Sequence, residues 1–338
     1  MAERTKTERR TAAVRFLKRA AGFVVAAALL AWVLHDVKVD LIFANVRIMD
    51  GGLIAAGLGL DILAYVVRVF RWQVLFRPLG RVSFLRTFEA TYAGLFLNEI
   101  LPVRVGEAAR AVLVSRRLGV GLPRIVPSMV LERVIEGIWL ALGVGIVAIF
   151  VPLPGHLARG ADILGAGILL ATAAFIIVAT RTPKPRPDNG GAAARGPLSR
   201  KLRSLFATLG EGFREIGLDR KVGASFALTL PYFLLQALAF WSLLEAYHIH
   251  LSVWTGGAVF LIVHLGTSVP GTPANVGAYQ FFCVVGLTLF GIDKTTATGF
   301  SIIGFLLLTA SILAIGLVAF LRSGLSLASL RERPPDLL

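Results

Sequence analysis

Long apolar runs constrain this chain more than any other feature of its sequence. Residues 20–34 are AAGFVVAAALLAWVL, residues 138–151 are IWLALGVGIVAIFV, and residues 301–321 are SIIGFLLLTASILAIGLVAFL. A helix needs about 20 apolar residues to cross the hydrocarbon core of a bilayer. Charged residues make up only 16% of the chain, against roughly 25% in soluble globular proteins. The sequence therefore predicts an all-α polytopic membrane protein.

The hydropathy pattern predicts about six spanning helices. We expect them at residues 15–34, 51–75, 125–150, 160–180, 222–246 and 297–321. Two further segments, 84–118 and 253–290, are too long for one span, and each is broken in the middle by Pro and Gly. Broken helices occur at membrane depth only where protein buries them or where they line a wet cavity. We therefore expect each segment to be a re-entrant hairpin of two half-helices.

Basic residues are concentrated beside the apolar runs. The first 19 residues hold seven Lys and Arg, and residues 181–221 hold ten. Positive residues mark the cytoplasmic side of a membrane protein. If the 84–118 hairpin enters and returns on that side, most of the 35 Lys and Arg become cytoplasmic. Both termini and the 181–221 linker are then cytoplasmic. The net charge of +15 suits anionic lipid headgroups, and no aromatic-interleaved basic platform points to nucleic acid.

The two hairpin segments resemble each other in sequence. LPVRVGEA has Pro102 and Gly106 four apart, and TPANVGAY has Pro273 and Gly277 four apart. If they enter from opposite sides, the two halves are inverted repeats, an architecture of many secondary transporters. The expected organisation is a basic N-terminus at 1–14, one transmembrane domain at 15–321 and a cytoplasmic tail at 322–338. Within that domain we expect repeat 1 at 15–150, the linker at 181–221, and repeat 2 at 160–180 and 222–321.

Ionisable residues at membrane depth are costly, so they indicate function or pairing. Glu107 and Arg110 are three apart and share a helix face. Arginine forks beside a half-helix N-terminus suit a lipid phosphate. The simpler alternative is that Glu107 and Arg110 only neutralise each other. The candidate substrate-binding residues are Arg68, Arg71, Glu99, Arg104, Glu107, Arg110, Glu132, Arg133, Glu136, Thr272, Asn275 and Gln280.

Three of these interpretations have simpler alternatives. Arg71 lies near a span end, where snorkelling to the interface is the expected behaviour. Arg133 lies between Glu132 and Glu136 and is expected to form an internal ion pair. In the second hairpin, uncharged groups such as Gln280 either bind a sugar, amine or hydroxyl headgroup or only satisfy the backbone of the broken helix.

Three motifs carry a family resemblance. LPVRVGEAARAVLVSRRLGV at 101–120, MVLERVIEG at 129–137 and VPGTPANVGAYQ at 269–280 resemble the flippase-like transmembrane family, which includes the membrane region of lysylphosphatidylglycerol synthases. The resemblance implies lipid translocation or lipid-linked envelope assembly in the bacterial inner membrane. Ala274, Asn275 and Gln280 depart from the family's PGGxG followed by Glu, and Glu136 stands where members commonly have Asp. We expect no synthase domain, because Leu338 follows the last span by only seventeen residues.

The expected function is flippase-like translocation of a phospholipid or lipid-linked envelope precursor across the cytoplasmic membrane. The sequence has no HExxH, GxSxG, Walker A or Rossmann motif, so we expect no enzyme activity, cofactor or metal. Two alternatives stay open: an intramembrane lipid-modifying enzyme, and a non-transporting partner of an envelope-lipid synthase. The expected partner is a membrane lipid with an anionic or lipid-linked headgroup. A homodimer or a synthase stays open as the protein partner, and no nucleic acid is expected.

Overall fold

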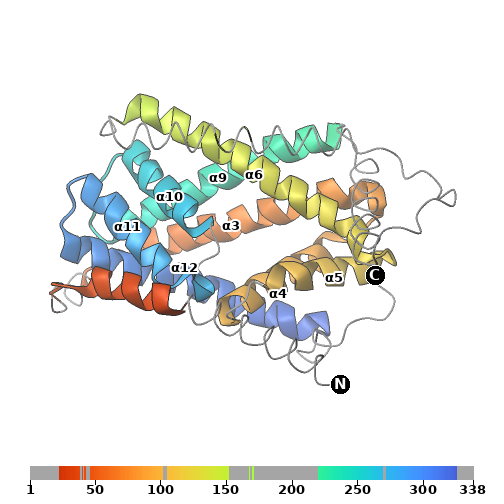
Figure 1. Cartoon of the computed structure of the whole chain (residues 1–338), viewed down its shortest axis with the longest axis horizontal. Coiled ribbons are helices and arrows are strands. Elements are labelled where there is room, and N and C mark those ends of the chain that lie inside the picture. Colours follow the sequence, from red (N-terminus) through yellow and green to blue (C-terminus); the bar gives the residue numbers. More distant parts are fainter. Residues whose placement is uncertain are drawn as a thin grey trace, which may run out of the picture. The chain divides into compact units, whose positions relative to one another are not determined.

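A computed structural model describes residues 23–38, 40, 42, 46–101, 105–151, 167, 170, 220–268 and 272–325 (Figure 1). These residues form helices and contain no strand. The α-helices are α3 (Gly51–Phe76), α4 (Phe84–Ile100), α5 (Gly106–Leu118), α6 (Leu122–Phe150), α9 (Arg220–Ala246), α10 (Val253–Ser268), α11 (Ala278–Leu289) and α12 (Lys294–Ser323). Two short 3-10 helices are η1 (Arg77–Leu79) and η2 (Pro273–Asn275). An apolar helix at Phe23–Leu34 precedes them.

The described helices include 4 that are long and apolar enough to cross a membrane, Gly51–Leu79, Leu122–Phe150, Arg220–Ala246 and Lys294–Ser323. The ends of each of these helices differ from the ends of a predicted span by about one helical turn or less. Apart from residues 167 and 170, the predicted span at 160–180 lies outside the described residues, as does the first part of the one at 15–34. The chain is an all-α polytopic membrane protein, as predicted.

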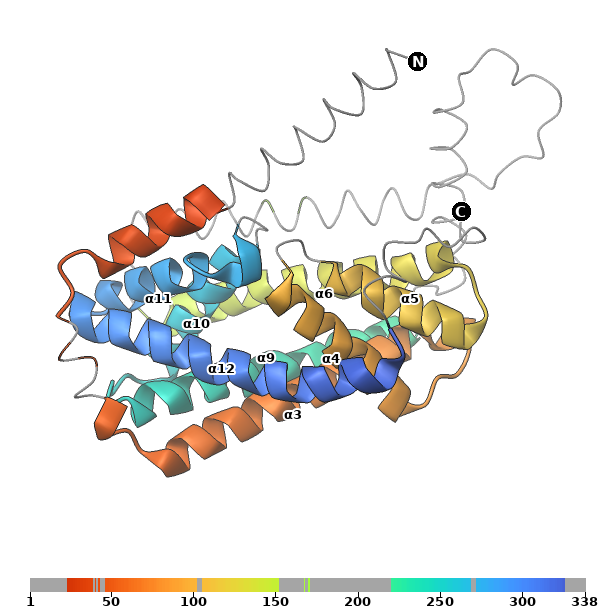
Figure 2. The same ribbon diagram turned by 90° about the horizontal axis from the view of Figure 1, so that it is seen from below.

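Each predicted hairpin segment is two helices with a break between them. A Cβ on Gly94 of α4 would lie 2.6 Å from the carbonyl oxygen of Gly106, so α4 and α5 approach closely at that point. Helices α10 and α11 lie side by side (Figures 1 and 2). Between them Ala274 and Asn275 have positive φ. The predicted break in each segment is confirmed, and the depth of the two breaks in a membrane stays a prediction.

The chain divides into two compact units, neither of which is continuous in sequence. Unit 1 comprises Met1–Asp61, Leu95–Val105 and Ala237–Ala314, and unit 2 comprises Ile62–Gly94, Gly106–Gln236 and Ile315–Leu338. Helices α3, α4, α9 and α12 therefore contribute residues to both units, whereas α6 lies wholly in unit 2. The predicted division into inverted repeats follows the sequence order instead, and it stays a prediction.

Each unit has its own buried aromatic and aliphatic residues. In unit 1, the ring of Phe300 contacts those of Phe240 and Tyr247, with centroids 5.4 and 5.9 Å away. In unit 2, Leu75 of α3 packs with Leu131 and Ile135 of α6. Burial of such side chains contributes about 1.5–3 kcal/mol each in water. The core of unit 2 fixes α3 against α6, and these two helices carry most of the charged residues described next.

Candidate functional site

Seven of the predicted site residues form one ion-pair cluster in unit 2. We call this set the arginine–glutamate cluster. Its members lie on α3, α5 and α6, and α5 and α6 are neighbours (Figure 1). Spacings of three and four residues place Arg68 with Arg71, Glu107 with Arg110, and Glu132 with Glu136 on one helix face. The members are Arg68 and Arg71 of α3, Glu107 and Arg110 of α5, and Glu132, Arg133 and Glu136 of α6.

Glu132 is the centre of the cluster and is fully buried. Its Oε1 accepts hydrogen bonds from Arg68 Nε at 3.2 Å and from Arg71 Nη2 at 3.0 Å. Its Oε2 accepts a hydrogen bond from Arg110 Nη2 at 2.7 Å. One carboxylate therefore joins arginines from two other elements.

The other two carboxylates close the network around Glu132. Glu136 accepts hydrogen bonds from Arg71 and from Arg133 Nη1, the latter at 2.8 Å. Glu107 pairs with Arg110 Nη2 at 2.7 Å and with Arg133 Nη2 at 2.6 Å. Each carboxylate of the cluster thus pairs with at least two arginines.

The cluster holds more positive than negative charge. Four arginines face three glutamates, which leaves one positive charge when every carboxylate is ionised. Within the described part of the chain, Nε and Nη1 of Arg110 and Nε of Arg71 are buried and have no hydrogen-bond acceptor. The Arg110 guanidinium also lies 4.5 Å from the ring centroid of Trp72. The site therefore has both charge and hydrogen-bond donors available for an anion.

Several residues around the cluster were missed by the sequence reasoning. Arg71 Nη1 donates to Thr229 Oγ1 of α9 at 3.0 Å, and its guanidinium lies 5.2 Å from the ring centroid of Tyr232. Trp72 Nε1 donates to Ser128 Oγ of α6 at 3.1 Å. The available signal was the occurrence of hydroxyl groups inside apolar spans, because such groups need partners away from water.

The structure separates the two alternatives proposed for individual arginines. Arg71 is completely buried, so the snorkelling interpretation is wrong for this residue. The internal ion pair of Arg133 is confirmed, although its side chain is 52% exposed. Glu107 is 28% exposed, whereas Glu132 is fully buried. The cluster is therefore open on the side of Arg133 and Glu107.

Four other predicted site residues belong to unit 1. They are Glu99, Thr272, Asn275 and Gln280. Gln280 Oε1 accepts a hydrogen bond from the backbone N–H of Gly277 at 2.7 Å. Gln280 thus satisfies the backbone where α11 begins, as one of the two predicted alternatives requires. The remaining predicted residue, Arg104, lies outside the described residues.

A model of one protein family matches most of the chain. It describes the lysylphosphatidylglycerol synthase TM region and matches residues 19–316. That match contains the arginine–glutamate cluster, both broken segments, three of the described spans and most of the fourth, Lys294–Ser323. A comparison with curated proteins finds no match. The chain belongs to the family of the lysylphosphatidylglycerol synthase transmembrane region.

Proposed function

We propose that the protein moves a phospholipid or a lipid-linked envelope precursor across the bacterial cytoplasmic membrane, and that the arginine–glutamate cluster binds the headgroup. Both termini are cytoplasmic in this proposal. Membership of a family related to lipid handling supports it. The observation that carries it is the surplus of guanidinium groups over carboxylates in a buried site.

A lipid phosphate suits this surplus. Guanidinium groups bind phosphate through two parallel hydrogen bonds, and Arg110 has two buried nitrogens without an acceptor in the described residues. Arg110 lies in the second turn of α5, which begins at Gly106. The free N–H groups of a helix N-terminus also favour an anion. The half-exposed Arg133 marks the side from which the headgroup enters.

The burial of these charges supports translocation. A charged headgroup meets a high free-energy barrier in hydrocarbon because it loses its hydration. A buried cationic site offers replacement contacts part of the way across, while the acyl chains stay in the lipid. The chain has no Walker A motif, so the movement is facilitated or coupled to an ion.

The pairing within the cluster favours transport over lipid chemistry. A general base needs a carboxylate that can accept a proton from the substrate. Glu107, Glu132 and Glu136 are each engaged by at least two guanidinium groups. These contacts stabilise the ionised form and occupy its lone pairs. The carboxylates therefore hold the arginines in place and do not abstract protons.

Reconstitution in liposomes tests this proposal. Purified protein is placed in vesicles whose outer leaflet carries a phospholipid with a fluorescent acyl chain, and a membrane-impermeant reductant reports the fraction left outside. We expect the protein to equalise the leaflets faster than protein-free vesicles do, with the lipid recovered chemically unchanged. Recovery of a modified lipid would favour the enzyme, and neither movement nor modification would favour a partner of a synthase.

A further inference from the structure

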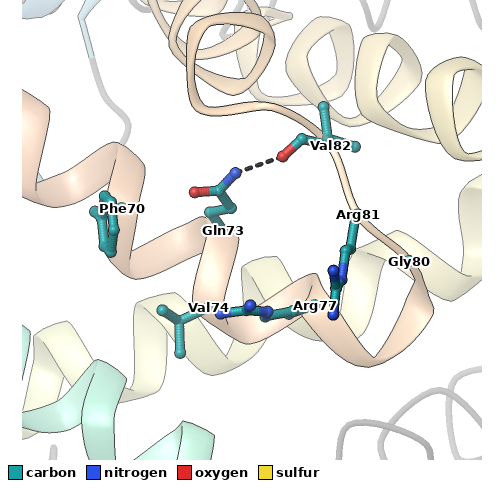
Figure 3. A pocket seen from close by; sticks show the side chains of 7 residues that line it. All are labelled: Phe70, Gln73, Val74, Arg77, Gly80, Arg81 and Val82. Carbon is teal, nitrogen blue, oxygen red and sulfur yellow. Dashed lines mark hydrogen bonds between the residues drawn. The ribbon is translucent and has the colours of Figure 1, made fainter.

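A pocket at the end of α3 offers a second basic site, separate from the arginine–glutamate cluster. It has a volume of about 170 Å³ and lies in the turn that leads from α3 through η1 toward α4 (Figure 3). Phe70 and Gln73 of α3 form one side, and Arg81 and Val82 of the following loop form the other. Arg77 completes the lining from η1.

The turn that forms the pocket is fixed by its backbone. Gly80 has φ of +147°, which only glycine adopts readily. A Cβ at Gly80 would lie 2.7 Å from the side chain of Leu118, so the loop packs closely on the end of α5. Gln73 Nε2 donates to the carbonyl oxygen of Val82 at 2.5 Å and ties the loop back to α3 (Figure 3). These contacts hold the turn, and with it the shape of the pocket, in place.

The chemistry of the lining is that of an anion site beside lipid. Arg77 and Arg81 are exposed, and neither forms an ion pair with a carboxylate in the part of the chain that the structure describes. No acidic residue lines the pocket, while Phe70, which is 51% exposed, gives it an apolar wall. The span ends at Leu79, which places both guanidinium groups at the depth of lipid headgroups.

Neighbouring charges add to the positive potential at this end of unit 2. Glu89 of α4 is buried and is shared by three arginines: Arg86 at 3.3 Å, Arg117 at 3.4 Å and Arg322 at 3.4 Å. One carboxylate cannot balance three guanidinium groups. Arg117 is close to the pocket, because it directly precedes Leu118, whose side chain packs against Gly80. The surplus attracts anionic lipids, and each surface Lys or Arg raises the affinity for them about fivefold.

We propose that this pocket binds the phosphate of an anionic phospholipid of the cytoplasmic leaflet. Arg77 and Arg81 hold the phosphate from two directions, and Phe70 contacts the glycerol and the first part of an acyl chain. The ligand is a resident lipid of the bilayer, distinct from the lipid that the arginine–glutamate cluster binds. The proposal does not depend on transport.

Binding of phosphatidylglycerol to the purified protein in detergent tests this assignment. A photoactivatable phosphatidylglycerol should label the segment 70–82, and unlabelled phosphatidylglycerol should compete. The double variant Arg77→Gln, Arg81→Gln should weaken this binding by about thirtyfold, the effect of two interfacial arginines. The matched control is Arg124→Gln, Arg220→Gln, which removes the same charge from exposed positions outside the pocket and should bind almost normally.

Three results would overturn the proposal. Equal loss of binding in the two double variants would mean that the chain attracts anionic lipid only through its net charge. Displacement of the lipid by millimolar inorganic phosphate would show that the pocket binds a soluble anion instead of a lipid. A wild-type affinity that does not fall as salt is raised would exclude phosphate contact. Because the readout is binding, failure of lipid movement in vesicles would leave this result unaffected.

Discussion

Glu132 is the residue on which the arginine–glutamate cluster depends most. It is fully buried and accepts hydrogen bonds from Arg68, Arg71 and Arg110. Its loss would leave four arginines with two carboxylates. By contrast, the loss of Arg110 leaves every carboxylate with another arginine. The two residues therefore have unequal structural roles although they touch each other.

We expect Glu132→Gln to lower the free energy of unfolding by about 3–5 kcal/mol, the cost of breaking a buried ion pair on one side. Arg110→Gln should lower it by about 1 kcal/mol, because Glu132 keeps two arginines and Glu107 keeps Arg133. Thermal unfolding of the purified variants in detergent gives the comparison. Equal destabilisation by the two changes would contradict the central role of Glu132.

A double-mutant cycle extends this test. When Arg110→Gln is added to Glu132→Gln, the buried surplus of charge falls, so the double variant should be more stable than Glu132→Gln alone. The interaction energy should be about 1–3 kcal/mol, the upper part of the range for residues in contact, because it must exceed the cost of Arg110→Gln alone. Additive effects would show that the contact between Glu132 and Arg110, 2.7 Å long, has no energetic consequence.

The residue types in the sequence predicted which residues belong to this cluster better than they predicted the burial and contacts of each residue. Charges in apolar spans pointed to Arg68, Glu132 and Glu136 because such charges need partners. The burial of Arg71 could not be predicted, since depth near a span end depends on what packs around it. Thr229 and Tyr232 of α9 are distant in sequence from α3, and only the folded chain brings them to Arg71.

At the scale of elements, hydropathy located the long helices well. Residues 51–75 were expected, and α3 is Gly51–Phe76; residues 222–246 were expected, and α9 is Arg220–Ala246. This agreement has a simple cause, because only a long apolar run can satisfy a span. The breaks were predicted from Pro and Gly. The close contact of α4 with α5 could not be predicted, because the packing of a glycine such as Gly94 depends on which helix lies opposite it.

That contact predicts the effect of one substitution in α4. A Cβ at Gly94 would lie 2.6 Å from the carbonyl oxygen of Gly106 and 3.3 Å from Cβ of Arg110. We expect Gly94→Ala to lower the free energy of unfolding by about 1–3 kcal/mol through overpacking and to disturb Arg110. The thermal midpoint in detergent reports the first effect.

Gly59→Ala is the matched control for this substitution. Gly59 lies within α3, and a Cβ there would meet no atom within 4 Å. Since alanine is favoured over glycine in a helix by about 1 kcal/mol, this variant should be as stable as the wild type or slightly more stable. If Gly94→Ala behaves like Gly59→Ala, the close approach of α4 and α5 is wrong.

At the scale of the whole molecule, charge distribution predicts the orientation in the membrane. The basic residues of the 181–221 linker predict that it is cytoplasmic, and a re-entrant first hairpin would make this prediction consistent with the other basic clusters. The compact units group residues differently from the proposed repeats. Sequence order therefore could not predict which hairpin residues would share a unit with the charged spans.

Cysteine labelling measures this orientation. In a Cys283→Ser background, which removes the single native cysteine, cysteines replace Pro187 and Gly155, two positions outside the described residues. A membrane-impermeant thiol reagent added to intact cells should label position 155 and spare position 187 until the membrane is opened. Labelling of position 187 in intact cells would contradict the inverted-repeat arrangement.

The central claim is that the positive surplus at Arg110 binds the headgroup of a moving lipid, and lipid movement by Arg110 variants in liposomes tests it most directly. Arg110→Gln should abolish movement while keeping the fold, and Arg110→Lys should restore it only in part, because a point charge replaces a bidentate fork. The matched control, Arg116→Gln, alters an exposed arginine of the same helix and should move lipid normally. If Arg110→Gln instead unfolds the protein, and the double variant Glu107→Gln, Arg110→Gln restores both folding and movement, the pair is a structural salt bridge and the claim is wrong.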